Sequence, residues 1–354
     1  MKKFLVIQTA FLGDVVLALA LINKLHTFFP DAHIDMVVRK GNEGIFGTGD
    51  GDENSVNGPI HLDGKFIGFH KHVGLHTLYI WDKRSNKTRN LLTLLKDLRR
   101  TKYDVVINCQ RFFSTGLMTV LTKGREKIGY RKNPLSFLFS RSVDHKIGDG
   151  RHEVDRLNDL IKHFTDTIRP LPKLFPDPWE LEPKYPMLGS TLNEDDPPYF
   201  CIAPASVWFT KQWPESKWIE LTRQLPQDYR LFLIGAPSEK ELCDRIIAGA
   251  GRGLNLAGDL SLLQTAALME DAVMNYVNDS APLHIASAMN APVTAVFCST
   301  VPAFGFGPLR ENGRVVETSE KLDCRPCGLH GYKACPKGHF KCALAIDIQR
   351  VIGS

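Results

Sequence analysis

Residues 273–300 place polar side chains where they could bind a phosphate. The apolar run VMNYVN is followed by Asp279 and Ser280, then by a short segment of helical character and a second apolar run. Asp279 and Ser280 could cap the helix and leave its first backbone N–H groups for an anion, with His284 one turn onward. This pattern predicts the carboxyl edge of a parallel sheet and a nucleotide diphosphate site. Alternatively, Asp279 and Ser280 only cap the helix, and His284 packs in the core.

Two further segments carry residues suited to group transfer. Gly13 and Asp14 follow the apolar stretch FLVIQ and open a helix, so the Asp14 carboxylate could act as a general base. Lys211 follows the apolar stretch YFCIAPAS and could neutralise a leaving diphosphate. The competing interpretations are an N-capping aspartate and a surface lysine.

The elements that must position these residues alternate along the chain. In the first half, apolar runs at FLVIQ, HIDMVV, LYIW and YDVVIN alternate with predicted helices over residues 15–29 and 91–100. A second alternating set starts at residue 199, after the proline- and acid-rich residues 170–198. Residues 44–77 are rich in glycine, aspartate and histidine and predict an inserted loop or hairpin. Each half therefore predicts a doubly wound α/β domain.

The motifs resemble those of one known family over nearly the whole chain. The segment TAFLGDVVLALALINKL at residues 9–25, the Lys-x-Trp-Pro-x-x-x-Trp pattern from Lys211 to Trp218, and residues 273–300 are similar to motifs of glycosyltransferase family 9, the ADP-heptose:lipopolysaccharide heptosyltransferases. The resemblance implies the GT-B fold class, in which two Rossmann-like domains face each other across a cleft. We expect an acceptor domain at 1–169, a linker at 170–198 and a nucleotide-sugar domain at 199–354.

The resemblance also implies a function and a set of site residues. It implies inverting transfer of heptose from ADP-heptose to the Kdo and heptose region of the lipopolysaccharide inner core, with Asp14 as base, Lys211 on the diphosphate and no catalytic metal. The residues expected to bind the nucleotide sugar are Thr210, Lys211, Glu239, Asp279, Ser280, Ala281 and His284. Those expected to bind the acceptor are Gly13, Arg111, Arg131, Lys132 and His152. For Glu239, the alternatives are a contact with the ribose and a helix cap.

The distribution of charge and the hydropathy of the chain indicate its binding partners and its location in the cell. Residues 83–102 hold eight Lys or Arg against the single acid Asp97. This asymmetry favours an acidic partner, a phosphorylated core saccharide or the anionic membrane surface, over nucleic acid. The competing interpretation is a solvated helix face. No apolar run reaches the roughly 20 residues that span a bilayer, so we expect a cytoplasmic protein peripheral to the inner membrane.

Four of the eight cysteines form a cluster within residues 324–342. Cys324, Cys327, Cys335 and Cys342 have the spacing C-x2-C-x7-C-x6-C, which would suit a structural zinc ion or an iron–sulfur cluster. Disulfides or free thiols are the alternatives.

Two other functions fit a GT-B architecture. A sugar-nucleotide epimerase would need further acid and base residues and no lipid acceptor, so the basic first half argues against it. A noncatalytic nucleotide-sugar-binding protein of an envelope assembly complex would tolerate the loss of the Asp14 carboxylate.

Overall fold

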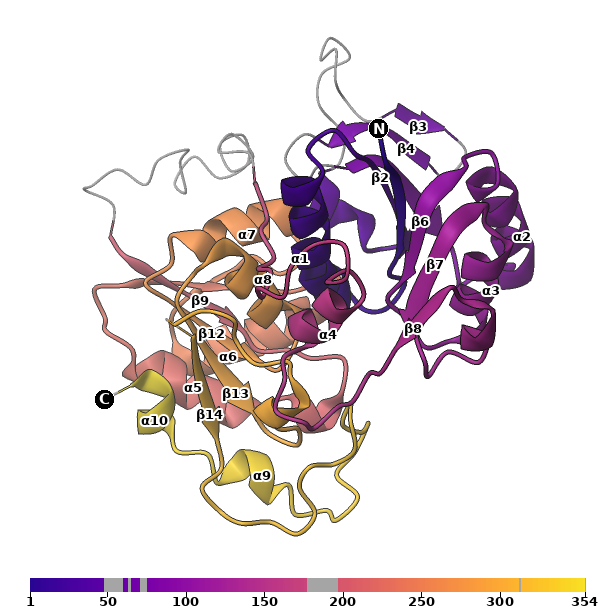
Figure 1. Ribbon diagram of the computed structural model, residues 1–354. Helices are drawn as coiled ribbons and strands as arrows, with labels where there is room; N and C mark the ends of the chain where they lie inside the picture. The colour runs from indigo at the N-terminus through magenta and orange to yellow at the C-terminus, as the bar shows by residue number, and fades with distance from the viewer. Residues whose placement is uncertain (48–59, 63–64, 71–74, 177–196, 312, 354) are drawn as a thin grey trace. The chain divides into compact units, whose positions relative to one another are not determined.

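The computed structural model describes residues 1–47, 60–62, 65–70, 75–176, 197–311 and 313–353, and it divides the chain into two compact units. Unit 1 comprises residues 1–147 and 153–175, and unit 2 comprises residues 148–152 and 176–354. Each unit contains its own sheet (Figure 1) and its own hydrophobic core. Most of the predicted linker and much of the predicted insertion lie outside the described residues.

Unit 1 has an eight-stranded sheet in the order β3-β4-β5-β2-β1-β6-β7-β8. The six strands from β5 to β8 in this order are parallel, and β3 and β4 pair as an antiparallel hairpin beside β5. The strands are β1 (Lys3–Ile7), β2 (His33–Arg39), β3 (Ile60–Leu62), β4 (Lys65–His70), β5 (Leu75–Trp81), β6 (Tyr103–Asn108), β7 (Gly124–Tyr130) and β8 (Arg141–Val143). The helices are α1 (Leu12–Phe28), α2 (Lys87–Leu98), α3 (Phe113–Leu121) and α4 (Glu153–Asp159), with short 3-10 turns η1 (Glu43–Phe46) and η2 (Ser136–Leu138).

Unit 2 has a six-stranded parallel sheet in the order β11-β10-β9-β12-β13-β14. The strands are β9 (Tyr199–Ala203), β10 (Arg230–Leu233), β11 (Leu254–Asn255), β12 (Met274–Asn278), β13 (Val293–Phe297) and β14 (Gly313–Glu317). The helices are α5 (Glu215–Gln224), α6 (Lys240–Ala250), α7 (Leu262–Glu270), α8 (Ala281–Met289), α9 (Lys341–Leu344) and α10 (Ile348–Ile352), with 3-10 turns η5 (Phe209–Lys211), η6 (Pro237–Glu239) and η7 (Pro302–Phe304).

The six parallel strands have the same order in both units. In each case the first strand of the unit lies in the middle, the next strands extend to one side, and the later ones extend to the other. Strand order therefore reverses between β1 and β6 in unit 1 and between β9 and β12 in unit 2. Ligands of such sheets bind outside the carboxyl ends of the strands at this reversal. The predicted doubly wound α/β class is confirmed.

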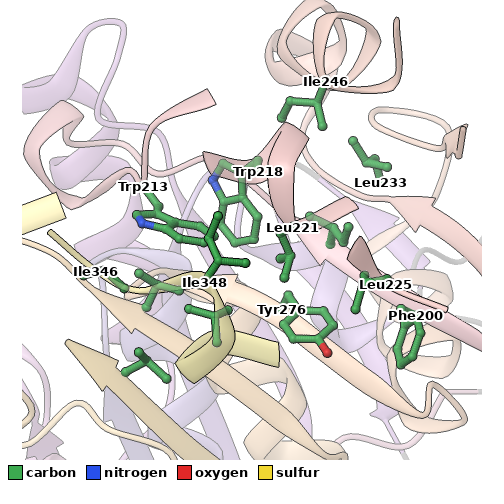
Figure 2. Close-up of a cluster of buried hydrophobic side chains, with 14 of the residues drawn as sticks. Phe200, Trp213, Trp218, Leu221, Leu225, Leu233, Ile246, Tyr276, Ile346 and Ile348 are labelled. Carbon is green, nitrogen blue, oxygen red and sulfur yellow. The ribbon is translucent and has the colours of Figure 1, made fainter. Parts of the chain in front are cut away.

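The core of unit 2 is built around two tryptophans of the predicted Lys-x-Trp-Pro pattern. Trp213 and Trp218 are almost fully buried and meet edge to face with ring centroids 5.0 Å apart. Figure 2 shows them beside Leu221, Tyr276 and Ile348, which come from α5, β12 and the C-terminal helix α10. The Trp213 indole N–H donates to the Ala343 carbonyl at 3.2 Å. This packing fixes the start of α5 and the η5 turn before it.

Helix α1 belongs to the core of unit 1 rather than to its surface. Eleven of its seventeen residues are buried, which is the pattern of a central helix. None of the described helices is long and apolar enough to cross a bilayer.

Candidate active site

Lys211 and Asp279 lie at the strand-order reversal of unit 2. The η5 turn that follows β9 carries Lys211, and Asp279 comes directly after β12. The Lys211 ammonium lies 2.8 Å from a carboxylate oxygen of Asp279, and both side chains are largely buried. The Thr300 hydroxyl donates to the same carboxylate oxygen at 2.6 Å. A positive group is thereby held at the carboxyl edge of the sheet, where a diphosphate would bind.

Asn278, the last residue of β12, holds the Lys211 loop in place by hydrogen bonds. Its side chain is fully buried, and its carbonyl oxygen accepts the Trp213 N–H at 2.9 Å. Its amide group donates to the Pro204 carbonyl at 2.7 Å. Asn278 thus holds both ends of the segment between β9 and α5, a role that was not predicted from the sequence. Its place just before Asp279 was the signal that could have identified it.

Thr210 holds the same loop from the other side. Its side chain is buried, and its hydroxyl oxygen accepts the Tyr332 N–H at 2.7 Å and the Ser299 O–H at 3.0 Å. The Thr210 N–H in turn donates to the Tyr332 carbonyl. These contacts favour a positioning role for Thr210 over the nucleotide contact predicted for it.

The prediction that Asp279 and Ser280 cap α8 holds for the position of Ser280 but not for the two side chains. Ser280 is the N-cap residue of α8, but its side chain makes no cap hydrogen bond; its hydroxyl is 3.4 Å from the Asn278 carbonyl. The Asp279 carboxylate binds Lys211 and Thr300 instead. Ala281 is the first residue of α8, so the positive end of the helix dipole lies beside the Lys211–Asp279 pair.

His284 is an uncharged core residue one turn into α8. It is 6% exposed, and burial lowers its pKa to about 3; the charges of His152 and Lys211 also lower it, whereas Asp279 raises it. Its Nδ1 atom has no hydrogen-bond partner among the described residues. The side chain is therefore neutral at pH 7. Its burial agrees with the competing interpretation, a histidine packed in the core.

His152 does not lie with the other residues predicted to bind the acceptor. Residues 148–152 group with unit 2, where the buried His152 ring contacts the Gly307 carbonyl through Nε2 at 2.9 Å. Its charge also acts on His284 of the same unit. The predicted acceptor contact of His152 is not supported by this position.

Glu239 lies after β10, at the same sheet edge as Lys211. Its carboxylate folds back and accepts the Ala236 N–H at 2.8 Å, and burial raises its pKa. A Cβ at Gly235 would lie 2.5 Å from a Glu239 carboxylate oxygen, so a larger residue there would displace this carboxylate. Glu239 therefore caps the η6 turn, and its side chain makes no cap hydrogen bond to α6.

In unit 1, Asp14 lies at the reversal between β1 and β6. It is the third residue of α1, and its carboxylate accepts the Phe11 N–H at 3.2 Å. Gly13 beside it is buried and Asp14 is half-buried. Burial and the charge of Arg84 lower the pKa of Arg39, which ends β2. The negative charge of Asp14 opposes this lowering. Asp14 thus combines a capping contact with an electropositive neighbour.

Lys83 and Asn42 hold the loop that leads to Asp14. The half-buried Lys83 ammonium donates to the Thr9 carbonyl at 2.7 Å and lies 4.6 Å from the centre of the Trp81 ring. The Asn42 amide donates to the Ala10 carbonyl at 2.9 Å. Burial, followed by the charges of Arg39 and Lys87, lowers the pKa of Lys83 to about 8. The sequence indicated a basic stretch here but did not single out Lys83.

Arg111, Arg131 and Lys132 follow β6 and β7 and are all exposed. The Arg111 guanidinium lies 5.6 Å from the centre of the Phe112 ring, and Arg131 pairs with the exposed Asp144 at 3.1 Å. All three follow the carboxyl ends of their strands, as Asp14 follows β1. The structure thus brings these three predicted acceptor residues to one sheet edge.

The cysteine cluster is not built as a metal site. Among the residues that the structure describes, no group of three or more His, Cys, Asp or Glu side chains is arranged to hold a metal ion. The Cys327 thiol contacts the Cys324 carbonyl at 3.1 Å, and Cys324 lies 3.7 Å from His339 Nε2. All eight cysteines are free thiols. The prediction of structural zinc is therefore not supported.

Two doubly wound α/β units are the components of the GT-B fold of glycosyltransferases. The family model described as glycosyltransferase family 9 (heptosyltransferase) matches residues 91–331. The chain belongs to this family and is a glycosyltransferase. The resemblance stated from the motifs is confirmed, and membership argues against the epimerase and binding-protein alternatives.

Individual relatives agree with this assignment. The chain is 27% identical over 317 residues to lipopolysaccharide heptosyltransferase 3 of Escherichia coli K12, covering 85% of this chain and 83% of that protein. It is 26% identical over 333 residues to lipopolysaccharide heptosyltransferase 1 of Pseudomonas aeruginosa, covering 92% and 86%.

A solved structure supports the fold. The family 9 glycosyltransferase of Veillonella parvula is 19% identical to this chain and superposes with a TM-score of 0.80, covering 99% of this chain and 95% of that one.

Proposed function

We propose that this protein transfers heptose from ADP-heptose, with inversion, to the Kdo and heptose region of the lipopolysaccharide inner core. Its relatives named above are lipopolysaccharide heptosyltransferases, which supports this donor and this class of acceptor. The observation that carries the proposal is the pair of polar sites at the two strand-order reversals, Lys211 with Asp279 in unit 2 and Asp14 in unit 1.

Lys211 and the start of α8 supply the positive charge for the diphosphate. The ammonium is held by Asp279 from one side, so it is positioned before the nucleotide arrives and little reorganisation is needed. As the glycosidic bond breaks, negative charge grows on the leaving diphosphate and is stabilised by Lys211 and the helix dipole. In this scheme these groups do what a divalent cation does in other transferases.

Asp14 acts as the general base. The acceptor hydroxyl gives its proton to the Asp14 carboxylate as its oxygen attacks the anomeric carbon from the face opposite the diphosphate, which inverts that centre. The hydrogen bond from Phe11 N–H holds the carboxylate at the sheet edge.

The basic groups around Asp14 fit an anionic acceptor. Arg39 is the last residue of β2, Lys83 follows β5, and Arg111 follows β6. Carboxylates of Kdo or phosphates of the core would pair with them. Because such an acceptor is anchored in a lipid bilayer, we place the enzyme at the cytoplasmic face of the inner membrane.

The test is transfer from ADP-heptose to a deacylated, phosphorylated inner-core oligosaccharide, with a chelator in one arm. Wild-type protein should transfer heptose with and without chelator. Asp14→Asn should lower kcat by about 10²–10⁴-fold while ADP still binds, because general-base catalysis contributes this much. Asp31→Asn, an exposed aspartate of the same unit, is the matched control and should keep full activity.

Each part of the proposal can fail separately. Full activity of Asp14→Asn would remove Asp14 as the base. Binding of ADP-heptose by the wild type without transfer to any inner-core saccharide would overturn the acceptor. Loss of activity in chelator would overturn the metal-free scheme.

A further inference from the structure

Unit 1 exposes a group of large apolar side chains beside its predicted acceptor residues. Their exposed fractions are 77% for Phe137, 58% for Phe113, 52% for Phe112 and 50% for Leu138. We call these four residues the Phe137 surface. They belong to two segments, the start of α3 and the η2 turn between β7 and β8, and Figure 1 shows α3 beside the end of the sheet that β7 and β8 form.

Asn133 joins the two segments of the Phe137 surface. It is buried, and its amide donates to the Phe112 carbonyl at 3.0 Å and to the Gln110 carbonyl at 3.2 Å. Its side-chain oxygen accepts the Leu135 N–H at 3.0 Å, which begins the turn that carries Phe137. A Cβ at Gly116 would lie 2.2 Å from this oxygen, so only glycine leaves room for Asn133.

Phe139 anchors the same turn from its other end. A Cβ at Gly129 would lie 2.6 Å from the Phe139 ring, so this ring packs directly on β7. With Asn133 buried on one side and Phe139 packed on the other, Phe137 and Leu138 between them are left on the outside. Internal contacts on both sides therefore fix the turn in a conformation that keeps Phe137 and Leu138 exposed.

Cations border the Phe137 surface. Arg111 precedes Phe112 and lies near its ring, and Arg131 and Lys132 precede Asn133. Arg131 has Asp144 as an exposed partner, and such surface pairs are weak enough to exchange for another anion. Exposed aromatic and leucine side chains flanked by Lys and Arg are the composition of surfaces that insert into the interface of an anionic bilayer.

We propose that the Phe137 surface docks on a bilayer of anionic phospholipid, with its apolar side chains in the headgroup boundary and its cations on lipid phosphates. The inference rests on the proposed function, since an inner-core acceptor is embedded in such a bilayer. The two segments of the Phe137 surface follow the carboxyl ends of β6 and β7, and Asp14 follows that of the parallel strand β1, so docking brings the proposed base to the membrane that holds the acceptor.

The first experiment measures vesicle binding and needs no activity. The probes are vesicles of phosphatidylethanolamine with phosphatidylglycerol, and vesicles of phosphatidylcholine alone. Wild-type protein should sediment with the first and much less with the second. The variant Phe112→Ser/Phe113→Ser/Phe137→Ser/Leu138→Ser should lose at least about tenfold in partitioning, since each tenfold corresponds to only about 1.4 kcal/mol.

Two further variants serve as a control in unit 2 and as a test of the cations alone. Val273→Ser/Leu344→Ser removes side chains that are 45% and 50% exposed in unit 2 and should bind vesicles as the wild type does. Arg131→Gln/Lys132→Gln leaves the apolar side chains in place, so it should bind weakly and lose its dependence on phosphatidylglycerol. Circular dichroism and thermal unfolding check that each variant is folded.

A second experiment separates this inference from the proposed function. The fourfold serine variant should keep the wild-type kcat/KM on the deacylated, soluble acceptor and lose activity on the acceptor embedded in vesicles. Unchanged vesicle binding by the variant would overturn the docking surface. A raised KM on the soluble acceptor with unchanged vesicle binding would also overturn it, since the surface would then bind the saccharide. If wild-type protein transfers to neither acceptor, the proposed function fails while the vesicle result stands.

Discussion

The ammonium of Lys211 and the carboxylate of Asp279 are 2.8 Å apart across the point where strand order reverses in unit 2. Both groups are largely removed from water, so their attraction is little screened. The removal of one partner would leave the other as a buried charge without compensation, which is far more costly than the absence of both.

Loss of either charge should therefore destabilise unit 2 more than loss of both. Lys211→Gln or Asp279→Asn alone should lower the free energy of unfolding by about 3 kcal/mol, and the double variant should lower it by less than either single change. Urea unfolding of the four proteins gives the coupling. The exposed pair of Arg131 and Asp144 is the control, with a coupling of about 0–1 kcal/mol. Equal couplings for the two pairs would contradict the burial argument.

Asn278 should control affinity for the donor without touching it. Asn278→Ala leaves the Trp213 N–H and the Pro204 carbonyl without their partner, which should cost about 3 kcal/mol and free the loop that carries Lys211. Weaker ADP binding by calorimetry should accompany the loss. The control is Asn275→Ala, in which a buried asparagine at the other end of β12 loses bonds to the Met269 and Pro292 carbonyls. That variant should lose stability and keep its ADP affinity; weakened binding in both would refute the positioning role.

His284 should make the free energy of unfolding depend on pH in the acid range. Its pKa is lowered to about 3 in the folded protein, so between about pH 6.5 and pH 3 the unfolded chain binds a proton that the folded chain does not. Stability therefore falls with falling pH in this window, by up to about 1.4 kcal/mol per unit from this residue. His284→Gln should flatten the difference between pH 6 and pH 4 by this slope. A slope unchanged in the variant would show that the imidazole does not stay neutral.

Lys83 should limit acceptor binding at alkaline pH. With its pKa lowered to about 8, its charge is present at pH 7 and is lost as the pH rises through 8. The KM for an anionic acceptor should therefore rise between pH 7 and pH 9 in the wild type. Lys83→Arg keeps its charge throughout and should show a smaller rise. The same rise in both proteins would remove Lys83 from acceptor binding.

Cys335 should react with iodoacetamide at lower pH than Cys342. Burial raises the pKa of Cys335, but hydrogen bonds from the N–H groups of Phe340 and its neighbours outweigh this effect and lower it. For Cys342, burial and the nearby thiols raise the pKa to about 11. The thiolate is the reactive form, so peptide mass spectrometry from pH 7 to pH 10 should find Cys335 labelled first. Equal labelling of both at pH 7 would contradict these environments.

The fold was largely predictable because its signals are local. Apolar runs of strand length placed β1, β2, β5 and β6 in unit 1 and the alternating strands after residue 199 in unit 2, whereas β7, β8 and β14 were not individually predicted. The helix expected from Val15 begins at Leu12, because the Asp14 carboxylate accepts the Phe11 N–H and lets the first turn form earlier. That detail depends on one hydrogen bond, which the hydropathy pattern does not contain.

The site was predictable in part because its residues meet only through the fold. Lys211 and Asp279 were each identified from neighbouring residues, but their pairing depends on strand order. Thr210 was expected on the nucleotide, and its orientation toward Ser299 and Tyr332 depends on the distant segment that contacts it. His152 was assigned by its place in the chain, which does not show that the backbone crosses to unit 2 there.

The cysteine-bearing segment is bound to the support of the donor loop. The Thr210 N–H donates to the Tyr332 carbonyl, and the Tyr332 N–H donates to the Thr210 hydroxyl oxygen. The Cys327 N–H donates to the Ser299 carbonyl at 2.8 Å, and the Arg325 side chain donates to the Cys298 carbonyl at 2.7 Å. A cysteine-rich stretch is thus connected by hydrogen bonds to the loop of the lysine proposed to hold the diphosphate. Oxidants or alkylating agents that distort this stretch would therefore inhibit sugar transfer noncompetitively. They would act without modifying any group that contacts the substrate.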